Sequence, residues 1–188
     1  MPTHIALLRG INVGGRNKVA MADLRDVVTS LGHADVATYI QSGNVVFSSD
    51  QPDTARLAAG LERAVAEALG VAAGVVVLTR AELAQVARDN PYAGDQNPKF
   101  VHVIFLPADP EPAMAASLAQ AQQQAVQKGS RDTVTLIGRA VFLHTPDGYG
   151  TSELAKLLGR AGGPMSARGA GTARNWATVT KLLALCGA

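Results

Sequence analysis

Residues 34–48 read ADVATYIQSGNVVFS and contain two short segments rich in β-branched and aromatic side chains. The segments, Val36 to Ile40 and Val45 to Ser48, flank the polar tetrapeptide Gln41-Ser42-Gly43-Asn44. This composition is typical of a tight hairpin, or of a bulge in one. We therefore expect two paired antiparallel strands here.

The segments on either side of this hairpin predict helices and further strands. Before it, an apolar run over 4–8 predicts a strand, and apolar residues at helical spacing predict a helix over 21–31. After it, helical spacing continues over 54–69, and residues 71–78 predict another strand. This order, β-α-β-β-α-β, is that of a ferredoxin-like unit, whose helices cover one face of the sheet.

The second half repeats the order β-α-β-β-α without detectable residue-by-residue similarity. We expect strands over 100–106, 133–137 and 140–144, and helices over 112–128 and 152–158. Gly138-Arg139 is the expected type II′ hairpin turn between the last two strands. A glycine-rich stretch over 159–171 then leads to a helix from Ala173 to about Leu185, capped by Thr172. The last strand is therefore either a short segment at 165–167 or is replaced by this helix.

The predicted fold class is α+β, with two tandem ferredoxin-like subdomains, the second atypical because of its C-terminal helix. The predicted division is a first subdomain over 1–79, a helical linker over 80–98 and a second subdomain over 99–188. The linker contains a short helix capped by Thr79, followed by a segment rich in asparagine, proline and glycine.

Composition narrows the cellular setting. The chain has 188 residues, of which 47% are apolar, and no apolar run approaches the roughly 20 residues that a membrane span needs. The amino terminus, MPTHIALLRG, lacks the features of a secretory signal. We therefore expect a cytoplasmic protein without a membrane partner. Cys186 is the single cysteine, so one chain can form neither a disulfide nor a cysteine-based metal cluster.

Motifs for catalysis or metal binding are missing from the sequence. The four histidines are isolated from one another, the acidic residues form no close pair, and no serine lies in a nucleophile-elbow motif. We therefore predict no metal and no cofactor, and the motifs leave open whether the chain is an enzyme.

Three polar segments are candidates for ligand binding. They hold the predicted ligand-binding residues Arg9, Asn12, Gly14, Gly15, Arg16 and Lys18, then Gln41, Ser42 and Asn44, and finally Arg174 and Asn175. Glycines let backbone N–H groups approach a ligand, and the cations favour an anion. The alternatives are a solvated loop, an ordinary hairpin turn and a plain terminal helix.

The distribution of charge supports an anionic ligand. The net charge is only +2, but residues 1–22 carry three basic side chains and residues 154–188 carry five, with no acid in either segment. If these ends meet in space, they form a positive patch.

The same segments carry a family resemblance. ALLRGINVGG (6–15), TYIQSGNVVF (38–47) and TARNWATVTKL (172–182) resemble the signature segments of the bacterial domain-of-unknown-function family DUF1697. The resemblance implies two ferredoxin-like subdomains and no established function. One departure is the glycine-rich approach to Thr172, which is longer than the family's usual connection.

We therefore expect an uncharacterised bacterial protein that binds an anionic ligand, nucleotide-like or phosphate-bearing, in a cleft between the two halves. Nucleic acid is the less supported ligand, because aromatic residues make up only 4% of the chain. One alternative is an enzyme acting on a phosphorylated or carboxylated metabolite. Another is a structural or protein-interaction module without a ligand. The oligomeric state is not predicted.

Overall fold

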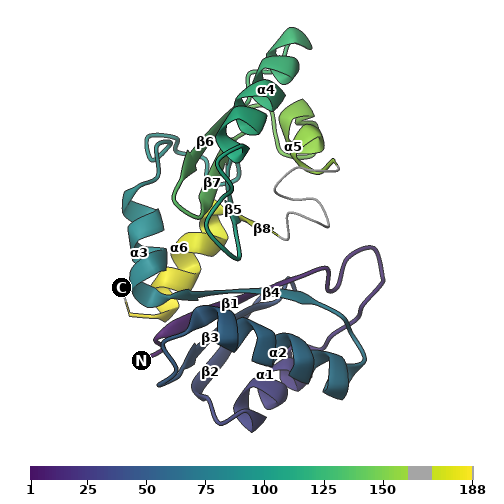
Figure 1. Cartoon of the computed structure of the whole chain (residues 1–188), viewed down its shortest axis with the longest axis vertical. Coiled ribbons are helices and arrows are strands. Elements are labelled where there is room, and N and C mark those ends of the chain that lie inside the picture. Colours follow the sequence, from purple (N-terminus) through teal and green to yellow (C-terminus); the bar gives the residue numbers. More distant parts are fainter. Residues whose placement is uncertain (161–170, 188) are drawn as a thin grey trace. The chain divides into compact units, whose positions relative to one another are not determined.

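Two four-stranded antiparallel sheets, one from each half of the sequence, form the framework of the chain (Figure 1). The structure is a computed structural model that describes residues 1–160 and 171–187. Its residues group into two compact units, Met1–Gln85 with Lys181–Ala188, and Val86–Thr180. The predicted division assigned residues 99–188 to the second half, whereas the last eight residues group with the first unit.

The sheet of the first unit has the strand order β2-β3-β1-β4, with every neighbouring pair antiparallel. Its elements are β1 (His4–Arg9), α1 (Met21–Ser30), β2 (Ala34–Tyr39), β3 (Asn44–Ser48), α2 (Thr54–Leu69) and β4 (Gly74–Thr79). Helices α1 and α2 lie side by side (Figure 1). This is the ferredoxin-like arrangement that the sequence predicts.

The core of the first unit lies between this sheet and its helices. Leu8 and Phe47 from the sheet pack with Leu24 and Leu61 from the two helices, all at most 2% exposed. The side chains of Ile5 and Leu7, on the opposite face of β1, are fully buried too. A strand buried on both faces has an unbroken apolar sequence, which explains the run Ile5-Ala6-Leu7-Leu8.

The second unit repeats this topology, with the strand order β6-β7-β5-β8. Its elements are β5 (Val101–Phe105), α4 (Met114–Gln127), β6 (Thr133–Ile137), β7 (Ala140–His144), α5 (Glu153–Leu158) and β8 (Thr172–Asn175). The β6–β7 hairpin turns at Gly138, where φ is +54°, while Arg139 keeps a negative φ. This agrees with the predicted type II′ turn.

A further helix follows the last strand of each sheet without a loop: α3 (Arg80–Arg88) after β4, and α6 (Trp176–Leu185) after β8. Helix α3 begins with a reciprocal capping box, in which Glu82 N donates to Thr79 Oγ1 and Thr79 N donates to Glu82 Oε2. It forms the helical part of the predicted linker.

The C-terminal helix is confirmed, but its predicted start is wrong. Residues 172–175 form β8, which pairs with β5 in the register Phe105↔Thr172 to His102↔Asn175. Helix α6 therefore begins at Trp176, and its cap is Asn175, whose Oδ1 accepts a hydrogen bond from Thr178 N. The other candidate for a last strand, at 165–167, lies outside the described residues.

No helix in the described ranges combines the length and the apolar character that crossing a membrane requires.

Candidate functional site

The segment after β1 is a short hairpin rather than an extended loop. Arg16 N donates to Val13 O, and Asn12 N donates to Asn17 O, both at 3.0 Å. Between them, Gly14 and Gly15 have φ values of +57° and +76°, which suits a turn with two consecutive left-handed residues. We call residues 10–19 the β1 loop.

Asn12 ties the β1 loop to its surroundings with three hydrogen bonds. Its Nδ2 donates to Val19 O at 2.9 Å and to Gln41 O at 2.8 Å, and its Oδ1 accepts from Val19 N at 2.9 Å. Asn17, which the sequence analysis did not select, donates from its Nδ2 to Gly10 O. These amide groups hold the two ends of the loop together and fix it to the β2–β3 turn.

The β2–β3 turn is itself held from within. Asn44 is fully buried, and its Nδ2 donates to Tyr39 O and to Ser42 Oγ. Gln41 is exposed beside them. The adjoining residue Ile40 has φ +49° although it is β-branched, a conformation that persists only where its surroundings hold it. The structure thus assigns Asn12 and Asn44 to the framework of the two turns.

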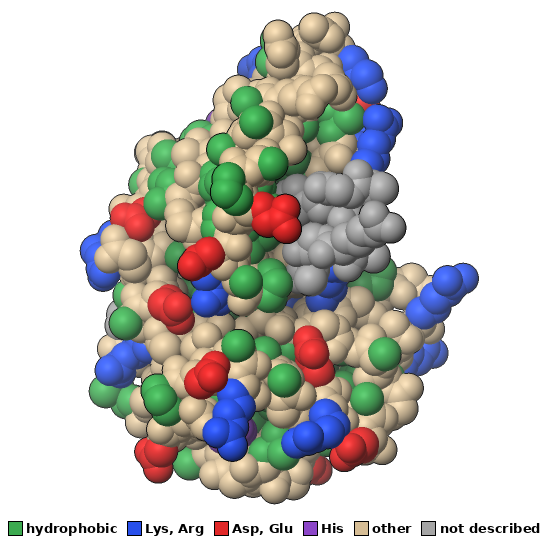
Figure 2. Space-filling model, in the orientation of Figure 1, with side chains coloured by type: hydrophobic (Ala, Val, Ile, Leu, Met, Phe, Trp, Pro, Cys, Tyr) green, Lys and Arg blue, Asp and Glu red, His purple; other side chains and the backbone are tan. Residues whose placement is uncertain are grey.

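The outer surface of the β1 loop carries groups that can bind an anion. Gly14, Gly15, Arg16 and Lys18 are exposed. In the described part of the chain, neither glycine N–H has a hydrogen-bond partner. The same holds for the side chains of Arg16 and Lys18, which have no acidic partner among the described residues. Lys and Arg side chains project at the position of this loop in Figure 2.

The other predicted cations are less exposed. Arg9 is half-buried at the end of β1. Arg174 belongs to the second unit, where it lies on β8 with 8% of its surface exposed. Its Nη1 donates to Thr172 Oγ1 and Ala173 O, both at 2.8 Å, and burial lowers the pKa of its guanidinium to about 10. Asn175 is the cap of α6.

Residues with metal-binding side chains do not gather anywhere in the described ranges, where no group of three His, Cys, Asp or Glu could hold an ion.

Two polar clusters escaped the sequence analysis because their members are far apart in the chain. In the second unit, His144 Nε2 lies 2.6 Å from Asp95 Oδ2, and the ring of Tyr92 stacks on His144 at 5.1 Å between centroids. Tyr92 also hydrogen-bonds Thr135, so this cluster fastens the segment after α3 to the β6–β7 hairpin. In the first unit, Thr3 and His4 line a pocket together with residues 49–52 and 79–81.

We expect His102 to make the stability of the second unit depend on pH. Burial lowers the pKa of its imidazole to about 4, and the ring stacks on Tyr149 at 4.1 Å. The unfolded chain binds a proton at this residue below about pH 6.5, whereas the folded chain stays neutral down to about pH 4. Stability should therefore fall as the pH drops from 6.5 towards 4.

His102→Phe keeps a ring for the stack and removes the titrating group. We expect the free energy of unfolding of this variant, measured by urea titration at intervals from pH 7 to 4.5, to fall less steeply than that of the natural chain. His4 and His33, whose pKa values are also lowered, chiefly by burial, should leave a residual slope. Equal slopes in the two proteins would show that His102 is not the group responsible.

Comparison with known proteins places the chain in a family. The model of the family described as proteins of unknown function, DUF1697, matches residues 1–142. The chain belongs to this family. Three quarters of its length is thus covered, and the resemblance seen in the sequence is confirmed.

A solved structure described as that of the conserved bacterial protein SP0830 from Streptococcus pneumoniae is similar throughout. It is 25% identical in sequence, the match covers 98% of each chain, and the TM-score is 0.70. No curated protein matches the chain. The similarity to this solved structure supports the fold, and membership of DUF1697 assigns no activity, so a functional proposal depends on the geometry of the residues themselves.

Proposed function

We propose that this DUF1697 chain binds an anionic, phosphate-bearing ligand at the β1 loop. The observation that carries the proposal is the Gly14–Gly15 turn, where two N–H groups without a partner among the described residues adjoin two exposed cations. Turns of this kind form anion-binding concavities, and Arg and Lys supply charge to them. Residues 1–22 contain no acid that would compete for these cations.

Preorganisation of the loop supports this role. A flexible loop loses conformational entropy when it closes on a ligand, which weakens binding. Here the three hydrogen bonds of Asn12 and the one of Asn17 hold the hairpin in place without using the outward-facing groups. The framework asparagines therefore contribute to affinity by positioning Gly14, Gly15, Arg16 and Lys18.

Titration with inorganic pyrophosphate, followed by amide chemical shifts of the isotopically labelled protein, tests the proposal. We expect saturable shifts at the amides of Gly14 and Gly15. The double variant Arg16→Ala/Lys18→Ala should bind at least about ten-fold more weakly, because each cation contributes roughly 1 kcal/mol at 4 Å in water.

A matched control removes the same charge elsewhere in the first unit. Arg56 and Arg63 are exposed on α2. Arg56→Ala/Arg63→Ala should leave the affinity for pyrophosphate within about two-fold, because salt screens the long-range attraction of distant charges. Equal losses in both double variants would mean that only net charge matters and would refute a site at the loop.

The salt dependence separates a small ligand from nucleic acid. If a single-stranded oligonucleotide binds and its log affinity falls steeply with log salt concentration, the ligand is nucleic acid. If the oligonucleotide binds weakly or not at all while pyrophosphate binds saturably, the ligand is a small molecule.

A further inference from the structure

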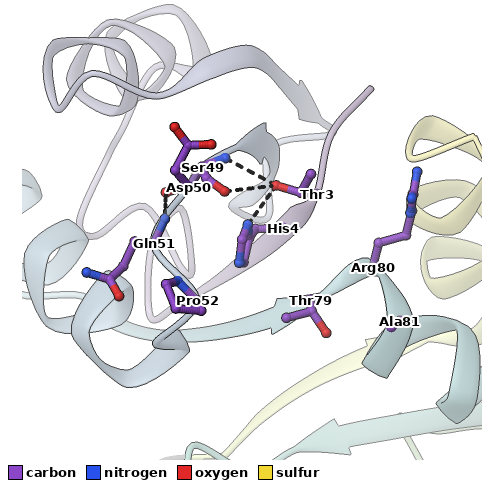
Figure 3. A pocket seen from close by; sticks show the side chains of 9 residues that line it. All are labelled: Thr3, His4, Ser49, Asp50, Gln51, Pro52, Thr79, Arg80 and Ala81. Atoms are coloured by element: carbon purple, nitrogen blue, oxygen red, sulfur yellow. Dashed lines mark hydrogen bonds between the residues drawn. The ribbon is translucent and has the colours of Figure 1, made fainter.

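A pocket of about 370 Å³ lies at the opposite end of β1 from the β1 loop. Its walls come from the start of β1, the segment between β3 and α2, and the junction of β4 with α3 (Figure 3). The lining residues are Thr3, His4, Ser49, Asp50, Gln51, Pro52, Thr79, Arg80 and Ala81. Five residue-to-residue steps of extended strand, about 17 Å in all, separate His4 from Arg9, so this pocket is distinct from the loop site. We call it the His4 pocket.

The feature that indicates a ligand is the imidazole of His4. This side chain is 5% exposed, and its Nε2 is buried without a hydrogen-bond partner in the described structure. Figure 3 shows the ring pointing from β1 into the space between Gln51 and Pro52 on one side and Thr79 on the other. A buried polar atom without a partner is costly, so such an atom in the wall of a pocket indicates a missing partner.

The hydrogen bonds of Thr3 show which partner each tautomer of His4 lacks. Thr3 Oγ1 accepts from Ser49 N at 3.1 Å and has one hydrogen to donate. Its two possible acceptors are His4 Nδ1, at 2.8 Å, and Ser49 O, at 3.4 Å. When the hydroxyl donates to the nearer atom, Nδ1, the neutral imidazole carries its proton on Nε2 and needs an acceptor there; when it donates to Ser49 O, the proton is on Nδ1. Burial chiefly, and then the nearby charge of His33, lower the pKa of His4, while Glu82 opposes them.

Other groups around the His4 pocket also donate. Ser49 Oγ accepts from Gln51 N, which leaves its own hydrogen available, and Gln51 Oε1 accepts from Asp53 N, which leaves the amide nitrogen available. The charged residues are directed elsewhere. In Figure 3 the carboxylate of Asp50 points away from His4, and Arg80 Nη1 donates to Cys186 O at 3.3 Å.

We propose that His4 carries its proton on Nε2 and that the His4 pocket binds a small molecule through a carboxylate or phosphate group, with one oxygen of that group accepting a hydrogen bond from His4 Nε2. Ser49 and Gln51 would donate to the remaining oxygens, and Pro52 and Ala81 would contact the apolar part of the molecule. The volume falls within the range of small-molecule sites, which combine apolar walls with a few convergent polar groups.

Chemical shifts of the imidazole nitrogens in isotopically labelled protein test this proposal with three probes: acetate, benzoate and inorganic phosphate. We expect His4 to show a proton on Nε2, and at least one probe to shift that signal saturably together with the amides of Ser49 and Gln51. Tighter binding of benzoate than of acetate would show that the apolar wall contributes to affinity, and equal binding would show that only the carboxylate is recognised. Phosphate tests the other anionic group.

His4→Phe preserves the ring and removes both nitrogens, so it should weaken binding of the effective probe at least ten-fold. The control is His33→Phe, which keeps a ring against Phe47 outside the pocket. Because the charge of His33 lowers the pKa of His4, the variants are compared at pH 7.5, where both imidazoles are neutral, and the control should bind as the natural protein does. If His4→Phe fails to fold, Ser49→Ala decides, with an expected three-fold or greater loss of affinity for the probe.

The Arg16→Ala/Lys18→Ala variant should bind the probe normally in the His4 pocket, which separates this site from the β1 loop. The absence of a saturable shift with all three probes, or unchanged affinity in His4→Phe or Ser49→Ala, would overturn the proposal.

Discussion

Replacing Gly43 by alanine is expected to lower the free energy of unfolding by about 3 kcal/mol, the sum of a left-handed conformation and a steric overlap. Gly43 has φ +75° in the β2–β3 turn. A Cβ atom there would lie 2.7 Å from Ile11 Cδ1 and 2.8 Å from Leu8 Cβ. The second contact involves an atom fixed to the backbone of β1, so the strand or the turn must move to relieve it.

Gly10→Ala is the matched control for this prediction. Gly10 has φ +76°, but a Cβ there would meet nothing within 4 Å, so only the conformational cost of about 1–2 kcal/mol applies. Chemical denaturation of both variants gives the difference, which measures the close packing of the turn against β1. If the two variants were equally stable, the overlap at Gly43 would be relieved at no cost and our account of this turn would be wrong.

Asp132→Leu is expected to destabilise the second unit by a similar amount, about 2–4 kcal/mol, because two buried donors lose their acceptor. Asp132 and Ser152 are both about 95% buried or more. Asp132 Oδ2 accepts from Ser152 Oγ at 2.8 Å and from Leu154 N at 3.4 Å, at the start of α5. Leucine has the same number and branching of side-chain heavy atoms, is larger, and accepts nothing.

Asp132→Asn separates the loss of the acceptor from other effects. The amide retains an oxygen for Ser152, so this variant should lose less than half as much stability as Asp132→Leu. Thermal and urea unfolding of both proteins would check the order. A leucine variant as stable as the asparagine variant would show that the hydrogen bonds of Asp132 contribute little.

The two proposed sites lie at opposite ends of β1 and use different chemistry. The β1 loop offers exposed cations and two backbone donors, which suits a solvated phosphate. The His4 pocket offers neutral, partly enclosed donors. Because no variant proposed for one site alters a residue of the other, each proposal can fail without affecting the second.

The sequence by itself was enough to predict the elements and their order as far as α5. Periodicity and turn formers predicted both hairpins, and residues 133–137 and 140–144 match β6 and β7. These signals are local: a helix or strand needs one apolar face, and that face repeats along the chain with its own period. The β1 loop could be recognised for the same reason, since its glycines and asparagines follow from backbone conformations within ten residues.

Tertiary structure alone decided the features that depend on partners distant in the chain. Thr172–Asn175 has the composition of a helix start, yet it becomes β8 because pairing with β5 outweighs that local preference. The amides of Asn12 and Asn44, predicted to face a ligand, are used to hold two turns together. His4 looked like an ordinary strand residue, and only the packing of the chain around it leaves its Nε2 buried without a partner in the described structure. A sequence pattern records the period of an element, whereas hydrogen-bond satisfaction is settled only when segments far apart in the chain meet.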